Sequence, residues 1–394
     1  MKKKIYIYLA LGLNLVLGLN IANAVTLTGY SGSLTNGNSV VLTGSGLGSK
    51  ASYQPLMNET MESGFFSSKW TDTHNLGLDK NSTNQRWSGS FVNAYCNMNS
   101  SQRKAYFTHD NTVYPVWYIR FWMKPGANFD YGAGDYTSLD RWFSNVKIIR
   151  LWNPGSTIEN FYVSYNGLTD ELYITAENIT GEKTNYAYQG FRSRLAKDQW
   201  HLWQFEWKEN SAPAKADGIY RLWIDGALIA SRTNVITRGT FAGFKRPFII
   251  GFEDEWNMGS AGDHAPNDFW MDDIVTDNTW TRFELSTCQN YSGLGCKSEY
   301  QPLTQVSDIQ ATFTFYQGQL PQGPVYGFWT DAQGNRNATG LSMQIGNVIA
   351  PPPPPLPIPP PPSSDPCASQ TGNFDLSGSI FLPGGNFTGT VIKR

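Results

Sequence analysis

The 394-residue chain has few charged residues and few histidines. Charged residues make up 16% of it, the formal net charge is −2, and no basic cluster follows the first four residues. Nucleic-acid binding needs concentrated positive charge, so the sequence predicts no nucleic-acid partner. The four histidines, His74, His109, His201 and His264, are scattered, and no Cys or His stands at the spacing of zinc ligands.

Cysteine is also scarce, with Cys96, Cys288, Cys296 and Cys367 as its four positions. In an oxidising compartment these residues are expected to pair. Cys288 and Cys296 enclose a short loop that contains glycine, which predicts a local disulfide. Cys96 and Cys367 are far apart in the sequence, so their partners stay open.

A long apolar run occurs only near the start of the chain. Three lysines at positions 2–4 precede the apolar run Ile5–Leu19, and Ala22–Ala24 has the small-x-small pattern of a cleavage site. This is the pattern of a secretory signal peptide. A retained membrane anchor is disfavoured, because Asn14 interrupts a run that is already short for a span. The sequence predicts a bacterial protein that is secreted, periplasmic or on the cell surface, without stable membrane insertion after cleavage.

Aromatic residues and glycine are abundant instead. Phe, Trp and Tyr make up 14% of the chain, and there are 38 glycines. This composition is typical of an all-β secreted protein. Aromatic rings pack against the C–H faces of sugars, but they also fill the cores of large sandwiches, so composition leaves both roles open.

Period-two alternation marks the strands. The runs His201–Lys208 and Tyr220–Asp225 alternate aromatic or aliphatic residues with polar ones, and Asp225-Gly226 predicts a tight turn before a return strand at Ala227–Ser231. No amphipathic helix of useful length is present, so we expect an antiparallel sandwich. Further strands are predicted at Val113–Lys124, Val146–Trp152, Phe161–Tyr165, Glu171–Ala176, Pro247–Phe252 and Phe269–Val275.

Three motifs carry a family resemblance. Trp200–Asn210, Asp217–Gly226 and Phe269–Ile274 resemble the concanavalin A-like lectin/glucanase jelly roll, a superfamily that includes laminin-G-like modules and several polysaccharide lyases. The resemblance spans residues 56–281 and implies a jelly-roll β-sandwich. Lectins, glycosidases, lyases and adhesion modules share this fold, so the resemblance implies no single activity.

Small β modules are predicted on both sides of the jelly roll. Asn38–Ser49 resembles the opening strands of immunoglobulin-like TIG domains, and short β runs recur after Thr281. These two segments can also complete one unit. The expected organisation is a signal peptide (1–24), a TIG-like β lead-in (25–55), the jelly roll (56–281), an immunoglobulin-like β module (282–350), a proline-rich linker (351–366) and a short tail (367–394).

Arginines and aromatic residues alternate on the predicted sheet faces. If Ile119 and Ile149 face the core, the opposite faces show aromatic rings interleaved with guanidinium groups, which predicts binding of an extracellular polysaccharide through a concave sheet face. A structural alternative pairs Glu206 with Arg120 or Arg150 on a neighbouring strand. The candidate carbohydrate-binding residues are Tyr118, Arg120, Trp122, Arg150, Trp152, Glu206 and Trp223.

Catalysis stays open. A polysaccharide lyase that acts on a uronate needs a Tyr or His base and an Arg, Asn or Gln that neutralises the carboxylate, and the same faces offer these types. The R-x-E-x-R, Q-I-H and Y-x-K-x-G strings of alginate lyases are absent. A glycosidase is disfavoured, because Glu253 and Glu255 have the wrong spacing and stand at a loop end. A surface adhesion protein without catalysis is the third alternative, supported by the stiff spacer Pro351–Pro362.

Calcium is the one cofactor that the sequence raises. Asp272 and Asp273 lie on the predicted closing strand, and Glu62 lies near the predicted first strand. In similar domains such acids sometimes hold a structural Ca²⁺ through oxygen ligands. A salt bridge at the rim of the sheet is the alternative.

Overall fold

The described part of the chain is all-β. Its residues form strands and connecting turns, and none belongs to a helix long and apolar enough to cross a bilayer. The predicted signal peptide, the proline-rich linker and the tail lie outside it. The computed structural model describes residues 25–74, 76–79, 84–86, 93–98, 104–109, 112–127, 129, 146–153, 159–166, 171–179, 185–189, 195–239, 246–254, 267–291 and 295–346.

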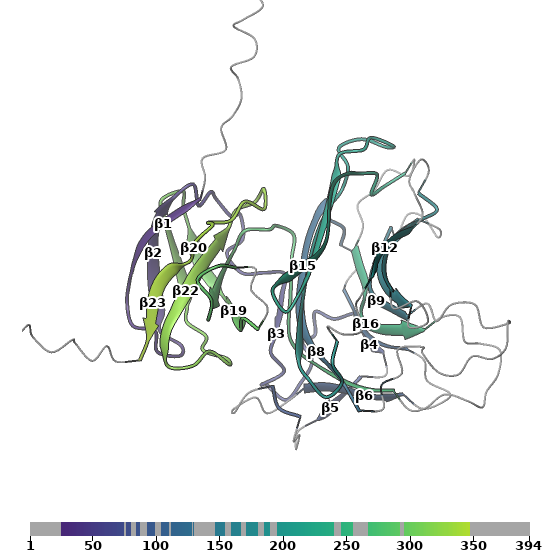
Figure 1. Cartoon of the computed structure of the whole chain (residues 1–394), viewed down its shortest axis with the longest axis horizontal. Coiled ribbons are helices and arrows are strands. Elements are labelled where there is room, and N and C mark those ends of the chain that lie inside the picture. The colour runs from purple at the N-terminus through teal and green to yellow at the C-terminus, as the bar shows by residue number, and fades with distance from the viewer. Residues whose placement is uncertain are drawn as a thin grey trace, which may run out of the picture. The chain divides into compact units, whose positions relative to one another are not determined.

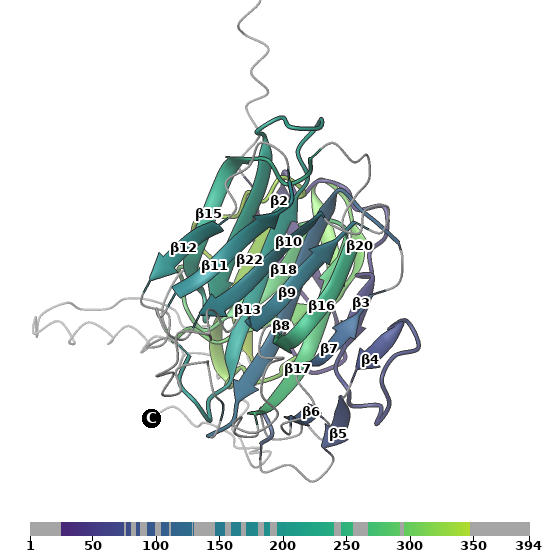
Figure 2. The same cartoon turned by 90° about the vertical axis from the view of Figure 1, so that its right-hand side faces the viewer.

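Two antiparallel sheets form the larger sandwich, which confirms the predicted fold class (Figures 1 and 2). The eight-stranded sheet has the order β15 (Ala227–Val235), β14 (Gly218–Ile224), β13 (His201–Lys208), β8 (Val116–Pro125), β17 (Asn267–Asp277), β6 (Asn93–Met98) and β5 (Gly77–Asp79), and β3 (Met57–Glu59) also pairs with β17. The seven-stranded sheet has the order β12 (Asn185–Gln189), β11 (Glu171–Glu177), β10 (Asn160–Asn166), β9 (Val146–Trp152), β16 (Arg246–Asp254), β7 (Lys104–Thr108) and β4 (Asp72–His74).

Alternation along the strands builds the core between these sheets. Trp203, Phe205 and Trp207 on β13 are buried on one face, and the ring of Trp203 stacks on Phe121 of β8 at 6.1 Å between centroids. Successive side chains of a strand point to opposite faces, so the same period sends Gln204 and Glu206 outward. Burying each large apolar side chain contributes about 2 kcal/mol.

The predicted hairpin is present as β13, β14 and β15. Trp203 pairs with Ile224, and the turn at Asp225 and Gly226 has positive φ at both residues, 50° and 77°. This is the geometry of a tight two-residue turn in which glycine is favoured at the second position. The Asp225 carboxylate fixes the turn, because it accepts a hydrogen bond from the Leu202 backbone N–H at 2.8 Å.

A small sandwich is formed from two segments, one on each side of the larger sandwich in the sequence. Strand β2 (Ser39–Ser45) pairs with β21 (Gln310–Thr314), with Val41 opposite Thr312, and the core includes Val40, Phe313 and Trp329. The TIG-like assignment stays a prediction. One sheet contains β1 (Thr26–Ser31), β2 (Ser39–Ser45), β21 (Gln310–Thr314) and β20 (Leu303–Val306); the other contains β19 (Ser298–Gln301), β18 (Arg282–Ser286), β22 (Gly323–Thr330) and β23 (Leu341–Ile345).

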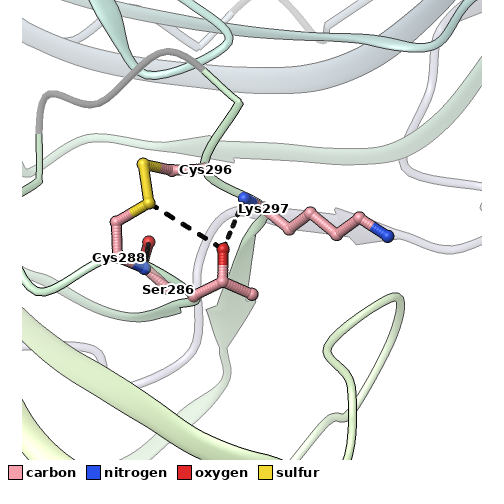
Figure 3. The surroundings of a disulfide bond; sticks show 5 residues. Ser286, Cys288, Cys296 and Lys297 are labelled. Carbon is pink, nitrogen blue, oxygen red and sulfur yellow. Dashed lines mark hydrogen bonds between the residues drawn. A yellow bond between two sulfur atoms is a disulfide. The ribbon is translucent and has the colours of Figure 1, made fainter.

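The predicted local disulfide joins Cys288 and Cys296, whose Cα atoms are 5.5 Å apart (Figure 3). Hydrogen bonds hold both ends of the loop: Cys288 N–H donates to the Ser286 hydroxyl, and Lys297 N–H donates to the Thr287 hydroxyl. The pairing of the other two cysteines lies outside what the structure describes.

His201 makes a pH-dependent contact at the start of β13. Its Nδ1 lies 2.6 Å from an Asp225 carboxylate oxygen and its Nε2 lies 2.9 Å from the Ala196 carbonyl oxygen. Both partners are acceptors, so both contacts are hydrogen bonds only when the imidazole is protonated. Burial alone lowers the pKa of His201, but its bonds to Asp225 and Ala196 outweigh burial and raise it.

We therefore expect His201→Asn to destabilise the fold by about 2 kcal/mol at about pH 5, because hydrogen bonds of a charged group are lost. A raised pKa gives a contribution that is full below about pH 6.5 and disappears as the pH rises through the folded-state value. The loss should therefore shrink at about pH 9, as measured by urea unfolding. Lys197→Gln, at an exposed neighbour in the same loop, is the control. An equal loss at both pH values for His201→Asn would contradict the assignment.

Candidate functional site

The seven predicted carbohydrate-binding residues do not share one sheet. The chain passes from the eight-stranded to the seven-stranded sheet between β8 and β9, and both strands alternate arginine with aromatic residues. Periodicity therefore identified outward faces correctly but did not reveal that they belong to opposite sides of the sandwich. Tyr118, Arg120, Trp122, Glu206 and Trp223 lie on the eight-stranded sheet, and Arg150 and Trp152 lie on β9 of the seven-stranded sheet.

The small sandwich contacts the outer face of the eight-stranded sheet. Arg120 Nη2 donates to the Ser298 carbonyl at 2.7 Å, and Gln204 Nε2 donates to Glu284 Oε1 at 2.5 Å. Trp122 and Trp223 are only 5% and 6% exposed. This corrects the expectation of an open concave groove at these residues, because a neighbouring module occupies the face.

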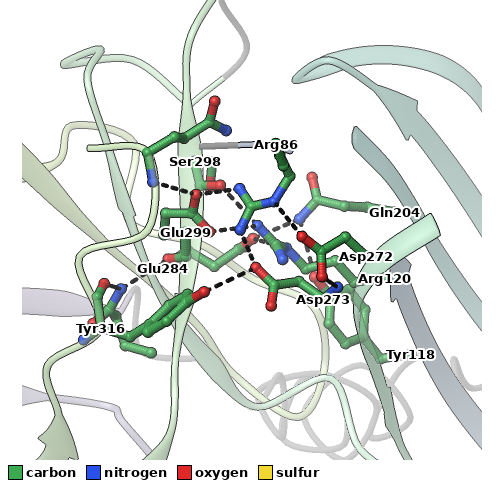
Figure 4. A network of polar contacts seen from close by, with 12 residues as sticks. Arg86, Tyr118, Arg120, Gln204, Asp272, Asp273, Glu284, Ser298, Glu299 and Tyr316 are labelled. Carbon is green, nitrogen blue, oxygen red and sulfur yellow. Dashed lines mark hydrogen bonds and ion pairs between the residues drawn. The ribbon is translucent and has the colours of Figure 1, made fainter. Parts of the chain in front are cut away.

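A network of arginines and carboxylates forms this contact (Figure 4). We call it the interface network. Five basic and five acidic side chains of the described chain are linked in it, so that it is neutral when all of them are ionised. Its members are Arg86, Arg120, Arg221, Arg282, Arg336, Glu206, Glu284, Glu299, Asp272 and Asp273.

Arg86 is one centre of the interface network. Its guanidinium lies 2.6 Å from Glu299 and 3.5 Å from Asp272, and it also contacts Asp273. Burial raises the pKa of Asp273, and the charge of Arg86 opposes that rise. Removing such carboxylates from water is costly, so they depend on the guanidinium for compensation.

Glu206 is the other centre. Its carboxylate lies 2.8 Å from both Arg221 and Arg282, and 3.9 Å from Arg336. The arginine partners expected from the sequence, Arg120 and Arg150, are thus replaced by three other arginines. Two of the three come from the small sandwich, whose packing against this sheet no local pattern reveals.

The predicted metal ligands Asp272 and Asp273 both contact Arg86. Asp273 has a positive φ of 46° and lies within a bulge of β17. Its side chain therefore does not follow the regular alternation of side chains along the strand. Glu62 lies in the turn after β3. Across the described residues, no group of three or more His, Cys, Asp or Glu is placed to hold a metal ion. Structural calcium stays an untested prediction.

The outer face of the seven-stranded sheet carries a second set of polar and aromatic residues. Ile149, Phe161 and Ile174 point into the core, so their neighbours along each strand point outward. We call this surface the β9–β11 face. It consists of Lys147, Arg150, Trp152, Asn160, Tyr162, Ser164, Tyr173 and Thr175.

Tyr162 is central on the β9–β11 face. It pairs with Arg150 on one side and with Thr175 on the other. The Lys147 ammonium lies 5.0 Å from the centroid of the Tyr162 ring, within the range of a cation–π contact. Arg150 Nε donates to Asn160 Oδ1 at 3.1 Å, which orients the guanidinium. The Lys147 ammonium therefore lies over the Tyr162 ring, and Arg150 is the cross-strand neighbour of Tyr162.

Lys147 reaches this face because of a bulge. Strict alternation from Ile149 and Leu151 places Lys147 in the core. The register between β9 and β10 shifts between Val163 and Ser164, so that Ser164 pairs with Lys147 on the outer face. A bulge adds one residue to a strand and reverses the alternation beyond it. For that reason the strand pattern did not predict Lys147 on this face. The same kind of pattern predicted the strand of Tyr162 but no role for its side chain.

Exposure rises toward the border of the β9–β11 face. Lys147 and Thr175 are 2% exposed, and Arg150 and Tyr162 are 7% exposed. Trp152 and Tyr173 are half-buried. The face thus combines deep polar groups with aromatic rings that solvent can reach.

The chain shows distant similarity to several solved structures. No family model and no curated protein sequence matches the chain. An endo-β-1,4-glucuronan lyase from the fungus Trichoderma reesei is 10% identical, with 57% of this chain and 96% of that chain covered and a TM-score of 0.41. An alginate lyase from Aplysia kurodai is 11% identical (61% and 98% covered, TM-score 0.39). The cellulose-induced protein Cip1 is 15% identical (57% and 97% covered, TM-score 0.35). Chains this different in sequence can differ in function.

We expect Glu206→Gln to destabilise the protein by about 3 kcal/mol, because it leaves three guanidinium groups without their shared buried carboxylate. Urea unfolding at neutral pH measures the loss. Asp217→Asn, which breaks an exposed pair with Lys215, is the control and should cost much less. Equal losses in the two variants would show that the interface network does not stabilise the fold.

Proposed function

We propose that the protein binds an acidic polysaccharide on the β9–β11 face. The observation that carries this proposal is the placement of Lys147 and Arg150 beside Tyr162 on one face. Ammonium and guanidinium groups make charge-assisted hydrogen bonds to carboxylates, which uronate chains carry at regular intervals. The predicted export of the protein supports a partner outside the cell.

Aromatic residues complete the match to a sugar chain. Trp152 is half-buried and lies under the Arg150 guanidinium, 4.6 Å from ring centroid to Cζ. A pyranose ring can pack on the exposed part of such a ring, while its carboxylate reaches the cations deeper in the face. Two cations are few for a nucleic acid, whose binding depends on many phosphate contacts.

Neutral substitutions test the binding proposal. Lys147→Gln and Arg150→Gln should each weaken binding of alginate, pectate or hyaluronan by about tenfold, the effect of one charge-assisted hydrogen bond. Calorimetric titration measures the affinities, with neutral dextran as a ligand that should not bind. Arg232→Gln, at an exposed arginine of β15, is the control variant. Unchanged affinity in both test variants would place the site elsewhere, and binding to no glycan at all would favour an adhesion protein.

Tyr162 also favours a second candidate function, a polysaccharide lyase. A phenolate at this position can take the C5 proton of a uronate as a double bond forms between C4 and C5 and the C4–O glycosidic bond breaks. The leaving oxygen takes up a proton, so the reaction needs no co-reactant. Arg150 with Asn160 would hold the carboxylate, whose charge neutralisation makes the C5 proton easier to remove.

A lyase would form an unsaturated uronate, which absorbs ultraviolet light. Under this reading, incubation with the right polyuronate should raise the absorbance, and Tyr162→Phe should slow that rise by at least about 100-fold through loss of the base. Binding by Tyr162→Phe should persist, which separates lost catalysis from lost affinity. No absorbing product from alginate, pectate or hyaluronan would exclude a lyase for these substrates and leave the binding proposal standing.

A further inference from the structure

The disulfide between Cys288 and Cys296 closes one end of a hairpin that carries part of the interface network (Figure 3). The hairpin consists of β18 and β19, which pair with each other. Strand β18 supplies Arg282 and Glu284 to the network, and β19 supplies Glu299. The disulfide therefore lies directly beside strands that join the two sandwiches.

Tyr291 lies inside the disulfide loop and contacts the larger sandwich. Its hydroxyl lies 3.0 Å from Gln204 Oε1 on β13 and 2.8 Å from Glu284 Oε2 on β18. The Gln204 amide also donates to Glu284 Oε1 at 2.5 Å. Because Gln204 belongs to the eight-stranded sheet and Glu284 to the small sandwich, these three residues join the two sandwiches through hydrogen bonds.

The ring of Tyr291 makes a second connection, through Arg336. The Arg336 guanidinium carbon lies 3.4 Å from the centroid of the Tyr291 ring and 5.5 Å from the centroid of the Trp223 ring on β14. Both distances are within the range of a cation–π contact. Arg336 therefore contacts both the disulfide loop and a tryptophan of the larger sandwich.

The disulfide limits the freedom of Tyr291. It joins two residues that are eight positions apart, so the loop between them can adopt few conformations. The Gln289 carbonyl also accepts a hydrogen bond from the Gly340 N–H at 2.9 Å. Opening the disulfide would raise the conformational entropy of the loop, and holding Tyr291 in place would then cost more free energy.

The disulfide lies near the surface of the small sandwich. Cys288 is half-buried and precedes the exposed residue Gln289, and Cys296 precedes the exposed residue Lys297. Exposed disulfides are reduced more readily than buried structural ones. A reductant is therefore expected to open this disulfide while the protein stays folded.

We propose that the Cys288–Cys296 disulfide is a redox-sensitive switch that controls how firmly the two sandwiches are held together. A dithiol opens it by thiol–disulfide exchange. A thiolate of the dithiol attacks one sulfur, and the other cysteine leaves as a thiolate. The second thiol of the reductant then closes its own disulfide and releases the first cysteine. The protein gains two electrons and two protons as two thiols, and the dithiol loses them.

Reduction removes the restraint on Tyr291 and weakens its contacts with Gln204, Glu284 and Arg336. The switch shares no residue with the β9–β11 face, and it acts on the other sheet of the larger sandwich. Reduction should therefore leave the binding of polyuronates unchanged, so the two proposals can fail separately.

Hydroxyl-radical labelling of the full-length protein, followed by mass spectrometry, tests the proposal through Trp223, which is 6% exposed. Reduction with dithiothreitol should raise the labelling rate of Trp223 about threefold or more, because the contact above its ring opens more often. Trp203, a core residue, should keep its rate. Cys288→Ser combined with Cys296→Ser should show the raised rate at once and no further response to dithiothreitol, which separates this disulfide from the other two cysteines.

Variants of Tyr291 test the route from the disulfide to Trp223. Tyr291→Ala removes the ring and the hydroxyl, so the oxidised variant should label Trp223 as fast as the reduced wild type, and reduction should add less than about twofold. Tyr291→Phe keeps the ring and should give an intermediate rate. Tyr326→Phe, on β22 of the small sandwich, is the matched control and should respond to reduction as the wild type does.

Three results would overturn the proposal. The first is that dithiothreitol produces no free thiol at Cys288 or Cys296 in the folded protein. The second is that reduction leaves the labelling rate of Trp223 unchanged, which would mean that the disulfide only closes its loop. The third is that reduction raises this rate equally in Tyr291→Ala and in the wild type, so that Tyr291 does not carry the effect.

Discussion

The architecture depends on the pairing of buried arginines with buried carboxylates across the contact between the two sandwiches. Each of these side chains alone would be costly to bury, since it would lose its hydration without compensation. Arg86, Glu206 and Arg282 each bridge several partners, so the cost is shared among them. The small sandwich is thus needed by the eight-stranded sheet, whose outer face carries too much charge to be covered by an apolar surface.

This pairing occupies the outer face of the eight-stranded sheet. The charges on the eight-stranded sheet are satisfied by the small sandwich, and Tyr291 of the disulfide loop adds a hydrogen bond to Glu284 at 2.8 Å. The disulfide closes the loop that carries Tyr291, and it therefore also holds this residue of the interface in place. The proposed polysaccharide site therefore lies on the seven-stranded sheet, where Lys147 and Arg150 lie beside aromatic rings.

Local sequence patterns predicted the all-β class, the hairpin around Asp225 and Gly226 and the disulfide between Cys288 and Cys296. Each rests on contacts between residues that are close in the sequence. The site was harder to predict for two physical reasons. The outward set that includes Arg120 is covered by residues far along the chain, and the bulge in β9 reverses the orientation of Lys147. Long-range packing leaves no trace in the period-two pattern of a strand, and the bulge interrupts that pattern in β9 by a single residue.

The pairing of β2 with β21 has a consequence for the order of folding. Ser39 lies opposite Thr314. The two parts of the small sandwich therefore come before and after the larger sandwich in the sequence. Bringing such distant segments together has a high entropic cost unless the intervening chain is already compact. The larger sandwich then acts as a spacer that brings the two ends together. Until synthesis has delivered both segments, β2 exposes an unpaired edge that can pair with other chains.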